Sequence, residues 1–262
     1  MRLVKDACPI LRARRYIKAG RIWRALRPLL GNGLILSEGE DHIRQRQQIG
    51  AALRKIPQAD IDAAVASFSW PDVGARVDLA KVMLQLAEHV MRRVLFGVDS
   101  GPDVGSAIRG WLRLMPLHLL GLPVGRKHLQ RLDAALAALP RPAWMPDLSP
   151  QEVRDQLATL YVASVETTAA DLTWRIAGRP QPPIWFLPRV DSETGESVIC
   201  LLGLADKFGA GHRRCIGEQL VMQVAHAVLA LPVRWQPLRL DLRPTTFSLT
   251  RWPRKAIMVR SA

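Results

Sequence analysis

The sequence has few cysteines and no long uninterrupted hydrophobic run. Its three cysteines, Cys8, Cys200 and Cys215, are odd in number, widely separated and without a C-x-x-C pair. This excludes a disulfide framework and a cysteine-rich zinc site, and makes a reducing cytoplasm the expected compartment. The first residues are interrupted by charge too often for a signal-peptide core, and no apolar run is long enough to span a bilayer. We therefore expect a cytoplasmic protein with no transmembrane segment.

Acidic residues are also scarce, since 23 Asp and Glu stand against 37 Lys and Arg, for a formal net charge of +14. Such a surplus raises nucleic acid, an anionic membrane or an acidic protein as partners. The arginines are scattered from Arg2 to Arg260 and no nucleic-acid recognition motif is present. We therefore expect no nucleic-acid binding and an arginine-rich solvated surface. A hydrophobic fraction of 48% over 262 residues suits one globular domain, residues 1–262, with a helical core.

The chain is organised around the stretch FGAGHRRCIG, from Phe208 to Gly217. It delivers Cys215 to the start of an apolar helix, where unpaired N–H groups stabilise a thiolate. Three glycines permit a tight turn and a close approach to a flat ligand, Phe208 shields the sulfur from water, and Arg213 brings positive charge. These are the needs of a haem iron with a thiolate ligand and a paired propionate. The three glycines are Gly209, Gly211 and Gly217. The alternative interpretation is that Cys215 is a buried, inert cysteine after a glycine turn.

A second group is the pair His42 and Arg46 in LILSEGEDHIRQRQQIG. Four residues apart on a predicted helix, the two side chains share one face and form a clamp for a carboxylate. Taken alone, such pairs are common on solvated faces. Beside the cysteine loop, the pair becomes a candidate anion clamp.

A third group, Glu166 and Thr167, lies in the predicted helix LYVASVETTAADLTW. An acid and an alcohol in an apolar helix can relay protons. The alternative is structural, because a threonine hydroxyl can bond back to the preceding turn of its own helix.

The remaining segments give the fold class. Residues 77–97 have helical periodicity, with Asp78 as the N-cap and Gly97 at the end. Residues 106–139 give two shorter helices separated by GLPVG, a hinge or lid over a pocket. The tail, residues 232–260, has strand-like stretches broken by prolines. We predict a mainly α protein with small terminal β-hairpins.

The loop FGAGHRRCIG resembles the haem-binding loop F-G-x-G-x-R-x-C-x-G of the cytochrome P450 family at every specified position. The resemblance implies that Cys215 ligates the iron of haem b and that Arg213 binds a propionate. GLILSEGEDHIRQR is similar to the family's H-x-x-x-R stretch, which gives His42 and Arg46 the same role. ASVETT is similar to the distal A-G-x-E-T-T helix, which gives Glu166 and Thr167 proton delivery. The segment PPIWFLPRV resembles the extended segment beside the haem, with Arg189 as a further propionate partner.

The chain departs from the family in several places. Ser164 stands where the family prefers glycine. No glutamate is followed three residues later by arginine, so the family's buried E-x-x-R pair is absent. The meander before the cysteine loop and the N-terminal sheet region are expected to be missing as well. The resemblance therefore implies a truncated cytochrome P450-like helical domain.

Three functions remain open from the sequence. The first is a haem-thiolate monooxygenase that inserts one oxygen atom from O2 into an apolar small molecule, with electrons from an acidic ferredoxin-type donor. The second is a non-catalytic or decayed relative that binds a partner or holds haem. The third is a haem protein that uses peroxide.

Overall fold

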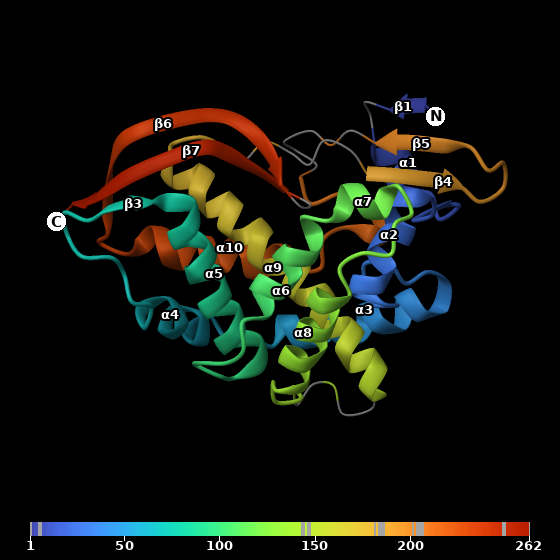
Figure 1. Cartoon of the computed structure of the whole chain (residues 1–262), viewed down its shortest axis with the longest axis horizontal. Helices are drawn as coiled ribbons and strands as arrows, with labels where there is room; N and C mark the ends of the chain where they lie inside the picture. The colour runs from blue at the N-terminus through green and yellow to red at the C-terminus, as the bar shows by residue number, and fades with distance from the viewer. Residues whose placement is uncertain are drawn as a thin grey trace. The chain divides into compact units, whose positions relative to one another are not determined.

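A computed structural model describes residues 2–4, 7–142, 145, 148–180, 182, 187–200, 202, 207–247 and 250–261 (Figure 1). The chain divides into two compact units. The first unit consists of Met1–Ala52, Pro102–Tyr161 and Pro183–Glu218, and the second of Leu53–Gly101, Val162–Pro182 and Gln219–Ala262. A single domain over residues 1–262 stays a prediction.

The first unit is mainly helical. Its helices are α1 (Cys8–Arg12), α2 (Arg21–Leu30), most of α3 (Gly39–Arg54), α6 (Val104–Leu112), α7 (Met115–Leu119), α8 (Arg126–Ala137), the first part of α9 (Pro150–Ile176) and the short 3-10 helix η1 (Gly211–Arg213). The basic stretch of residues 11–30 is divided between two helices. A turn at Arg14 and Arg15, followed by β2 (Tyr16–Ile17), separates α1 from α2.

A small sheet in the same unit joins the N-terminal residues to the approach to the cysteine loop. Its strand order is β1 (Arg2–Val4), β5 (Ser197–Cys200), β4 (Leu187–Asp191) and β2, with β1 parallel to β5 and the other pairs antiparallel. The sequence predicts no sheet at this end of the chain. The difference arises because the partner strands lie more than 150 residues away in sequence, where local patterns carry no signal. The extended segment expected at 182–189 lies partly outside the described residues, and β4 begins at Leu187.

The second unit contains α4 (Gln58–Ala66), β3 (Arg76–Asp78), α5 (Leu79–Phe96), the rest of α9, α10 (Glu218–Ala230, apart from its first residue), β6 (Arg234–Phe247) and β7 (Thr250–Ser261). Figure 1 draws β6 and β7 as a long hairpin, with β3 paired to β7. The predicted caps of α5 are confirmed. The Asp78 carboxylate accepts a hydrogen bond from the Ala80 N–H at 3.2 Å, and Gly97 ends the helix with a φ of 67°.

The prediction of a mainly α protein with a terminal β-hairpin is thereby confirmed. No helix in the described ranges combines the length and the hydropathy needed to cross a membrane.

Candidate haem site

The basic residues predicted from three distant stretches come together in the first unit. His42 lies on α3 and is 4% exposed, Arg189 lies on β4 and is 3% exposed, and the Arg213 side chain, two residues before Cys215, is 7% exposed. Arg46 lies one turn after His42 and is half-buried. The first unit therefore concentrates buried positive charge close to the cysteine loop.

Lys18 also belongs to this cluster, and sequence reasoning missed it. Its Nζ donates to the Ile35 carbonyl at 2.8 Å and lies 5.1 Å from the centre of the Trp23 ring, over which Arg189 also lies at 5.8 Å. The pKa of Lys18 is well below its usual value because of burial and the nearby Arg189 and Arg213. The partners of Lys18 come from distant stretches, so the sequence carries no local signal for its role.

One carboxylate, Glu38, lies among these cations. It accepts an ion-paired hydrogen bond from Arg213 and a hydrogen bond at 2.9 Å from the backbone N–H of Lys18. The pKa values of Lys18, Arg189, His212 and Arg213 are all lowered, and the negative charge of Glu38 opposes this lowering. Glu38 directly precedes α3 in the chain, so the same short segment supplies the carboxylate and the two predicted clamp residues.

The positive groups of the cluster shift one another's protonation. Burial, followed by the charges of Arg213 and Arg46, lowers the pKa of His42 to about 3, so this histidine is neutral at pH 7. Burial likewise lowers the pKa of Arg189 to about 10 and lowers those of Arg46 and Arg213. A shift away from the charged form indicates that the cluster lacks negative charge, which a bound anion would supply.

Two buried nitrogen atoms point to the same conclusion. Within the described part of the chain, Nη1 of Arg213 and Nδ1 of His212 have no hydrogen-bond partner. The His212 ring lies edge-on to that of His42, with ring centres 6.0 Å apart. Buried polar groups without partners are rare in folded proteins, so these two nitrogens indicate a place for an acidic ligand.

The cysteine loop has the tight backbone predicted for it. The Cys215 N–H donates to the Phe208 carbonyl at 2.7 Å, and Gly209 and Gly211 have φ angles of 73° and 66°. A side chain at Gly211 would come within 2.7 Å of the backbone of Leu11 and Arg12, so α1 packs directly against the loop. Gly217 has open space around it.

The Cys215 side chain is exposed, whereas Cys200 is buried. Surrounding protein atoms still desolvate the Cys215 thiol and raise its pKa, and Glu218 acts in the same direction. The Gly217 backbone hydrogen bond and the charges of Arg46 and Arg214 lower it, but burial outweighs them. The thiolate stabilisation expected from the N–H groups alone is therefore too small to lower the pKa of this cysteine without a bound cation.

These residues fit a haem. No group of three or more His, Cys, Asp or Glu side chains within the described ranges could hold a bare metal ion. An iron held in a porphyrin needs only one protein ligand from this side, and an accessible cysteine supplies it. Two propionates would bring the negative charge that the cluster lacks. The charge of Cys215 acts to raise the pKa of Arg46, so the sulfur lies within electrostatic range of the cation cluster.

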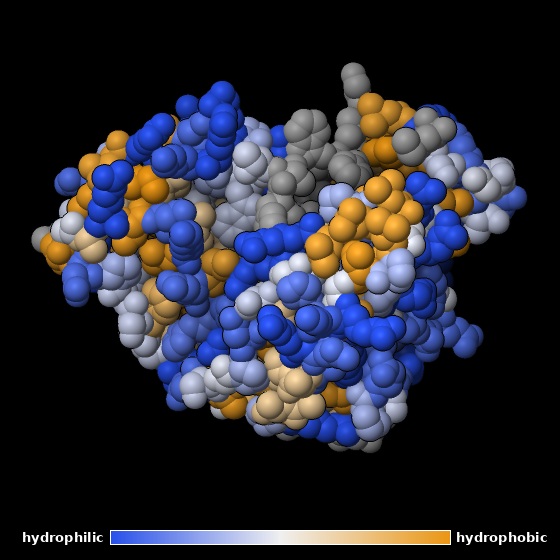
Figure 2. Space-filling view, in the orientation of Figure 1, coloured by the Kyte–Doolittle hydropathy of each residue, from blue (hydrophilic) through white to orange (hydrophobic). Residues whose placement is uncertain are grey.

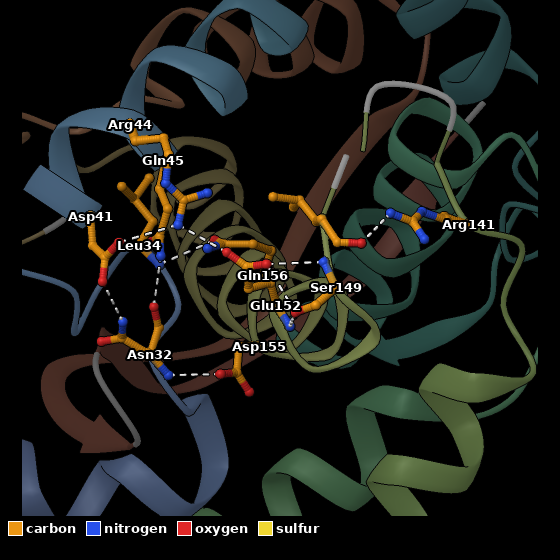
Figure 3. Close-up of polar contacts among 11 residues, drawn as sticks. Asn32, Leu34, Asp41, Arg44, Gln45, Arg141, Ser149, Glu152, Asp155 and Gln156 are labelled. Carbon is orange, nitrogen blue, oxygen red and sulfur yellow. Dashed lines mark hydrogen bonds and ion pairs between the residues drawn. The ribbon is translucent and has the colours of Figure 1, made fainter. Parts of the chain in front are cut away.

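A polar network connects the segment before α3 to the first turns of α9 (Figure 3). The Asn32 N–H donates to Asp155 at 2.8 Å, and the Leu34 N–H donates to Gln156 at 3.1 Å. Arg44 of α3 pairs with Glu152 at 2.9 Å. These contacts fix the start of α3, and with it His42 and Arg46, against α9 within the first unit.

Glu166 and Thr167 lie on α9 in the second unit. Glu166 is 4% exposed. Thr167 is half-buried, and its hydroxyl donates to the carbonyl of Ala163, four residues earlier. This is the structural bond expected as the alternative to proton delivery, and it holds the threonine oxygen in one rotamer.

No family model matches the sequence. Curated relatives include cyclooctatin synthase of Streptomyces melanosporofaciens, 29% identical over 68% of this chain and 46% of the relative. Cyclooctat-9-en-7-ol 5-monooxygenase of the same organism is 28% identical over 61% of this chain and 44% of the relative. A Mycobacterium tuberculosis protein named as a cytochrome P450 is 28% identical over 56% of this chain and 40% of that protein. The chain thus spans less than half the length of these relatives.

Among solved structures, a six-coordinated cytochrome P450 from Thermus thermophilus matches with a TM-score of 0.75 and 20% identity, over 99% of this chain and 92% of that chain. The resemblance to the cytochrome P450 family is therefore confirmed: the chain has the fold of a solved cytochrome P450 and is similar in sequence to a protein named as one.

Proposed function

We propose that this protein is a haem-thiolate monooxygenase of the cytochrome P450 type, with Cys215 as the iron ligand. The observation that carries the proposal is the cluster of buried cations around Glu38, within electrostatic reach of an accessible cysteine. Haem b, when bound, supplies oxygen activation with two external electrons. One relative bears the name of a monooxygenase, which supports insertion of one oxygen atom as the reaction.

In this proposal the residues of the first unit bind and orient the cofactor. His42, Arg46, Arg189 and Arg213 bind the propionates, and Lys18 and His212 add nitrogens that can form hydrogen bonds at the same place. Phe208 and the loop glycines, Gly209, Gly211 and Gly217, let the backbone approach the macrocycle and keep water from the sulfur. Burial of the arginines strengthens their attraction for carboxylates, since the local dielectric is low.

Glu166 and Thr167 are proposed to deliver protons on the distal side. The substrate is proposed to be an apolar small molecule and the electron donor an acidic ferredoxin-type protein, which the net charge of +14 would attract.

The difference spectrum of the haem-loaded, dithionite-reduced protein, recorded with and without carbon monoxide, tests the proposal. A red-shifted Soret band of the thiolate type is expected, and Cys215→Ala should abolish it. Cys8→Ala and Cys200→Ala are the matched controls and should leave the band unchanged for each bound haem. Loss of the band in the Cys200 variant, or its persistence in the Cys215 variant, would contradict the assignment.

The missing E-x-x-R pair supports a second candidate, a non-catalytic protein that holds haem or binds a partner. That pair braces the cysteine loop in the family, and its loss loosens the ligand geometry. Product formation from an apolar substrate would separate the candidates, with reductant and ferredoxin in one arm and hydrogen peroxide in the other. A thiolate-type spectrum without product in either arm would favour the non-catalytic protein, and product with peroxide alone would identify a peroxide-using enzyme.

A further inference from the structure

A cleft lies between α6 and α8 in the first unit, apart from the residues assigned to haem. Its volume is about 580 Å³. Arg109 and Arg113 line it from α6 and the residue that follows it, and His128 and Arg131 line it from α8. Four basic side chains from two packed helices therefore converge on one cleft.

Three arginines and one aspartate, Asp103, line this cleft, so positive charge exceeds negative charge there. In the part of the chain that the structure describes, the guanidinium groups of Arg109, Arg113 and Arg131 form no hydrogen bond or ion pair. Asp103, which also lines the cleft, already accepts a hydrogen bond at 2.7 Å from the Ser106 N–H at the start of α6. The sequence has no acidic residue between Asp103 and Asp133.

Asp133, the next acid along the chain, is engaged elsewhere. It pairs with Arg154 at 2.9 Å and does not line the cleft. On the face drawn in Figure 2, hydrophilic residues gather over α8, next to hydrophobic residues over α7. Asp133 therefore does not offset the positive charge of the arginines that line the cleft.

The walls of the cleft are shaped by small residues. A side chain at Gly110 would come within 2.4 Å of the His128 ring, so the glycine lets the imidazole lie directly against α6. Ala107, Ala134 and Ala135 contribute an apolar part of the lining. The cleft therefore offers donors for an anion together with a limited surface for a compact apolar group.

We propose that this cleft binds a small organic phosphate through Arg109, Arg113, Arg131 and His128. Guanidinium groups form paired, charge-assisted hydrogen bonds to phosphate oxygens, and three of them without protein partners match a group that carries two or more negative charges. The alanine lining then contacts the organic part of the ligand. This binding is independent of haem, because none of the four residues belongs to the proposed haem site.

Titration calorimetry with inorganic pyrophosphate at about 150 mM NaCl, where long-range attraction is screened, tests the anion site. Saturable binding of one pyrophosphate per chain is expected. Ala134→Glu, which adds a carboxylate inside the cleft, should lower the association constant at least about tenfold. Ala137→Glu is the control, since it makes the same change at another exposed position of α8 outside the cleft, and it should alter binding less than about twofold. Equal weakening by both variants would indicate attraction to net charge alone and overturn the proposal, as would the absence of saturable binding.

A second pair tests the arginines themselves. Arg131→Gln should weaken pyrophosphate binding about tenfold, and Arg126→Gln, on the same helix but outside the cleft, less than about twofold. The far-ultraviolet circular dichroism of each variant verifies that it is folded. Comparison of phenyl phosphate with inorganic phosphate tests the apolar lining, since the phenyl ester should bind more tightly than the inorganic ion. Tighter binding of inorganic phosphate would exclude an organic phosphate as the ligand.

Discussion

Arg213 forms an ion pair with Glu38, while its other terminal nitrogen, Nη1, has no hydrogen-bond partner in the described part of the chain. One terminal nitrogen of Arg213 therefore bonds within the protein, and the other is available to a ligand. Since the Arg213 side chain is only 7% exposed, the unpaired nitrogen is held away from water.

The first prediction concerns Glu38→Gln in the haem-free protein. Removing this charge leaves Arg213 and Lys18 buried among other cations, and the free energy of unfolding should fall by about 2 kcal/mol. Urea unfolding measures the loss. Haem should reduce it, because the propionates replace the missing negative charge.

Glu193→Gln is the control for that experiment. Glu193 pairs with Arg15, and the two side chains are 65% and 47% exposed, so its loss should change stability by less than about 0.5 kcal/mol. If the two variants lost equal stability, the buried ion pair of Glu38 with Arg213 would stabilise the fold no more than the exposed pair of Glu193 with Arg15.

The sequence predicts the cysteine loop, the caps of α5 and the cationic residues because each depends on a local pattern. The loop glycines and the Asp78 cap are set by neighbours within a few residues. The sequence does not predict the pairing of β1 with β5, the packing of α1 on Gly211, or the position of Lys18 in the cation cluster. Each of those joins residues that are distant along the chain, where burial and charge rather than local propensity decide the contact.

The second prediction separates two glycines that the loop motif treats alike. Gly211→Ala should lower the free energy of unfolding by about 2 kcal/mol or more, because its φ of 66° disfavours a side chain and the added Cβ would meet the backbone of α1. Gly217→Ala has open space and should change it by less than about 0.5 kcal/mol. Urea unfolding of the haem-free variants measures both. Equal tolerance at the two positions would show that α1 does not brace the loop.

The third prediction concerns pH. His42 has a pKa of about 3 in the folded chain against an ordinary value of 6.5. The unfolded chain therefore binds the extra proton between these values, so stability is lost as pH falls below about 6.5. Between pH 7 and pH 5, protonation linked to His42 should lower the free energy of unfolding by about 2 kcal/mol.

His42→Gln removes that titration, so the haem-free variant should lose about 2 kcal/mol less than the parent over the same interval. Urea unfolding at the two pH values provides the comparison. Parallel losses in parent and variant would place the pKa of His42 near its ordinary value and remove the argument that buried cations surround it.

The last prediction concerns Thr167→Ala in the haem-loaded protein. If Thr167 delivers protons, the variant should keep the thiolate-type spectrum but form severalfold less product for each reductant consumed. Thr173→Ala is the matched control, because its hydroxyl makes the same kind of bond, at 2.7 Å, to the carbonyl four residues earlier on the same helix. The Thr173 variant should lose stability without losing coupling. A structural role for the hydroxyl bond predicts similar coupling in both variants, whereas a relay predicts a loss at Thr167 alone, so the ratio of product to reductant decides between the two interpretations of this helix.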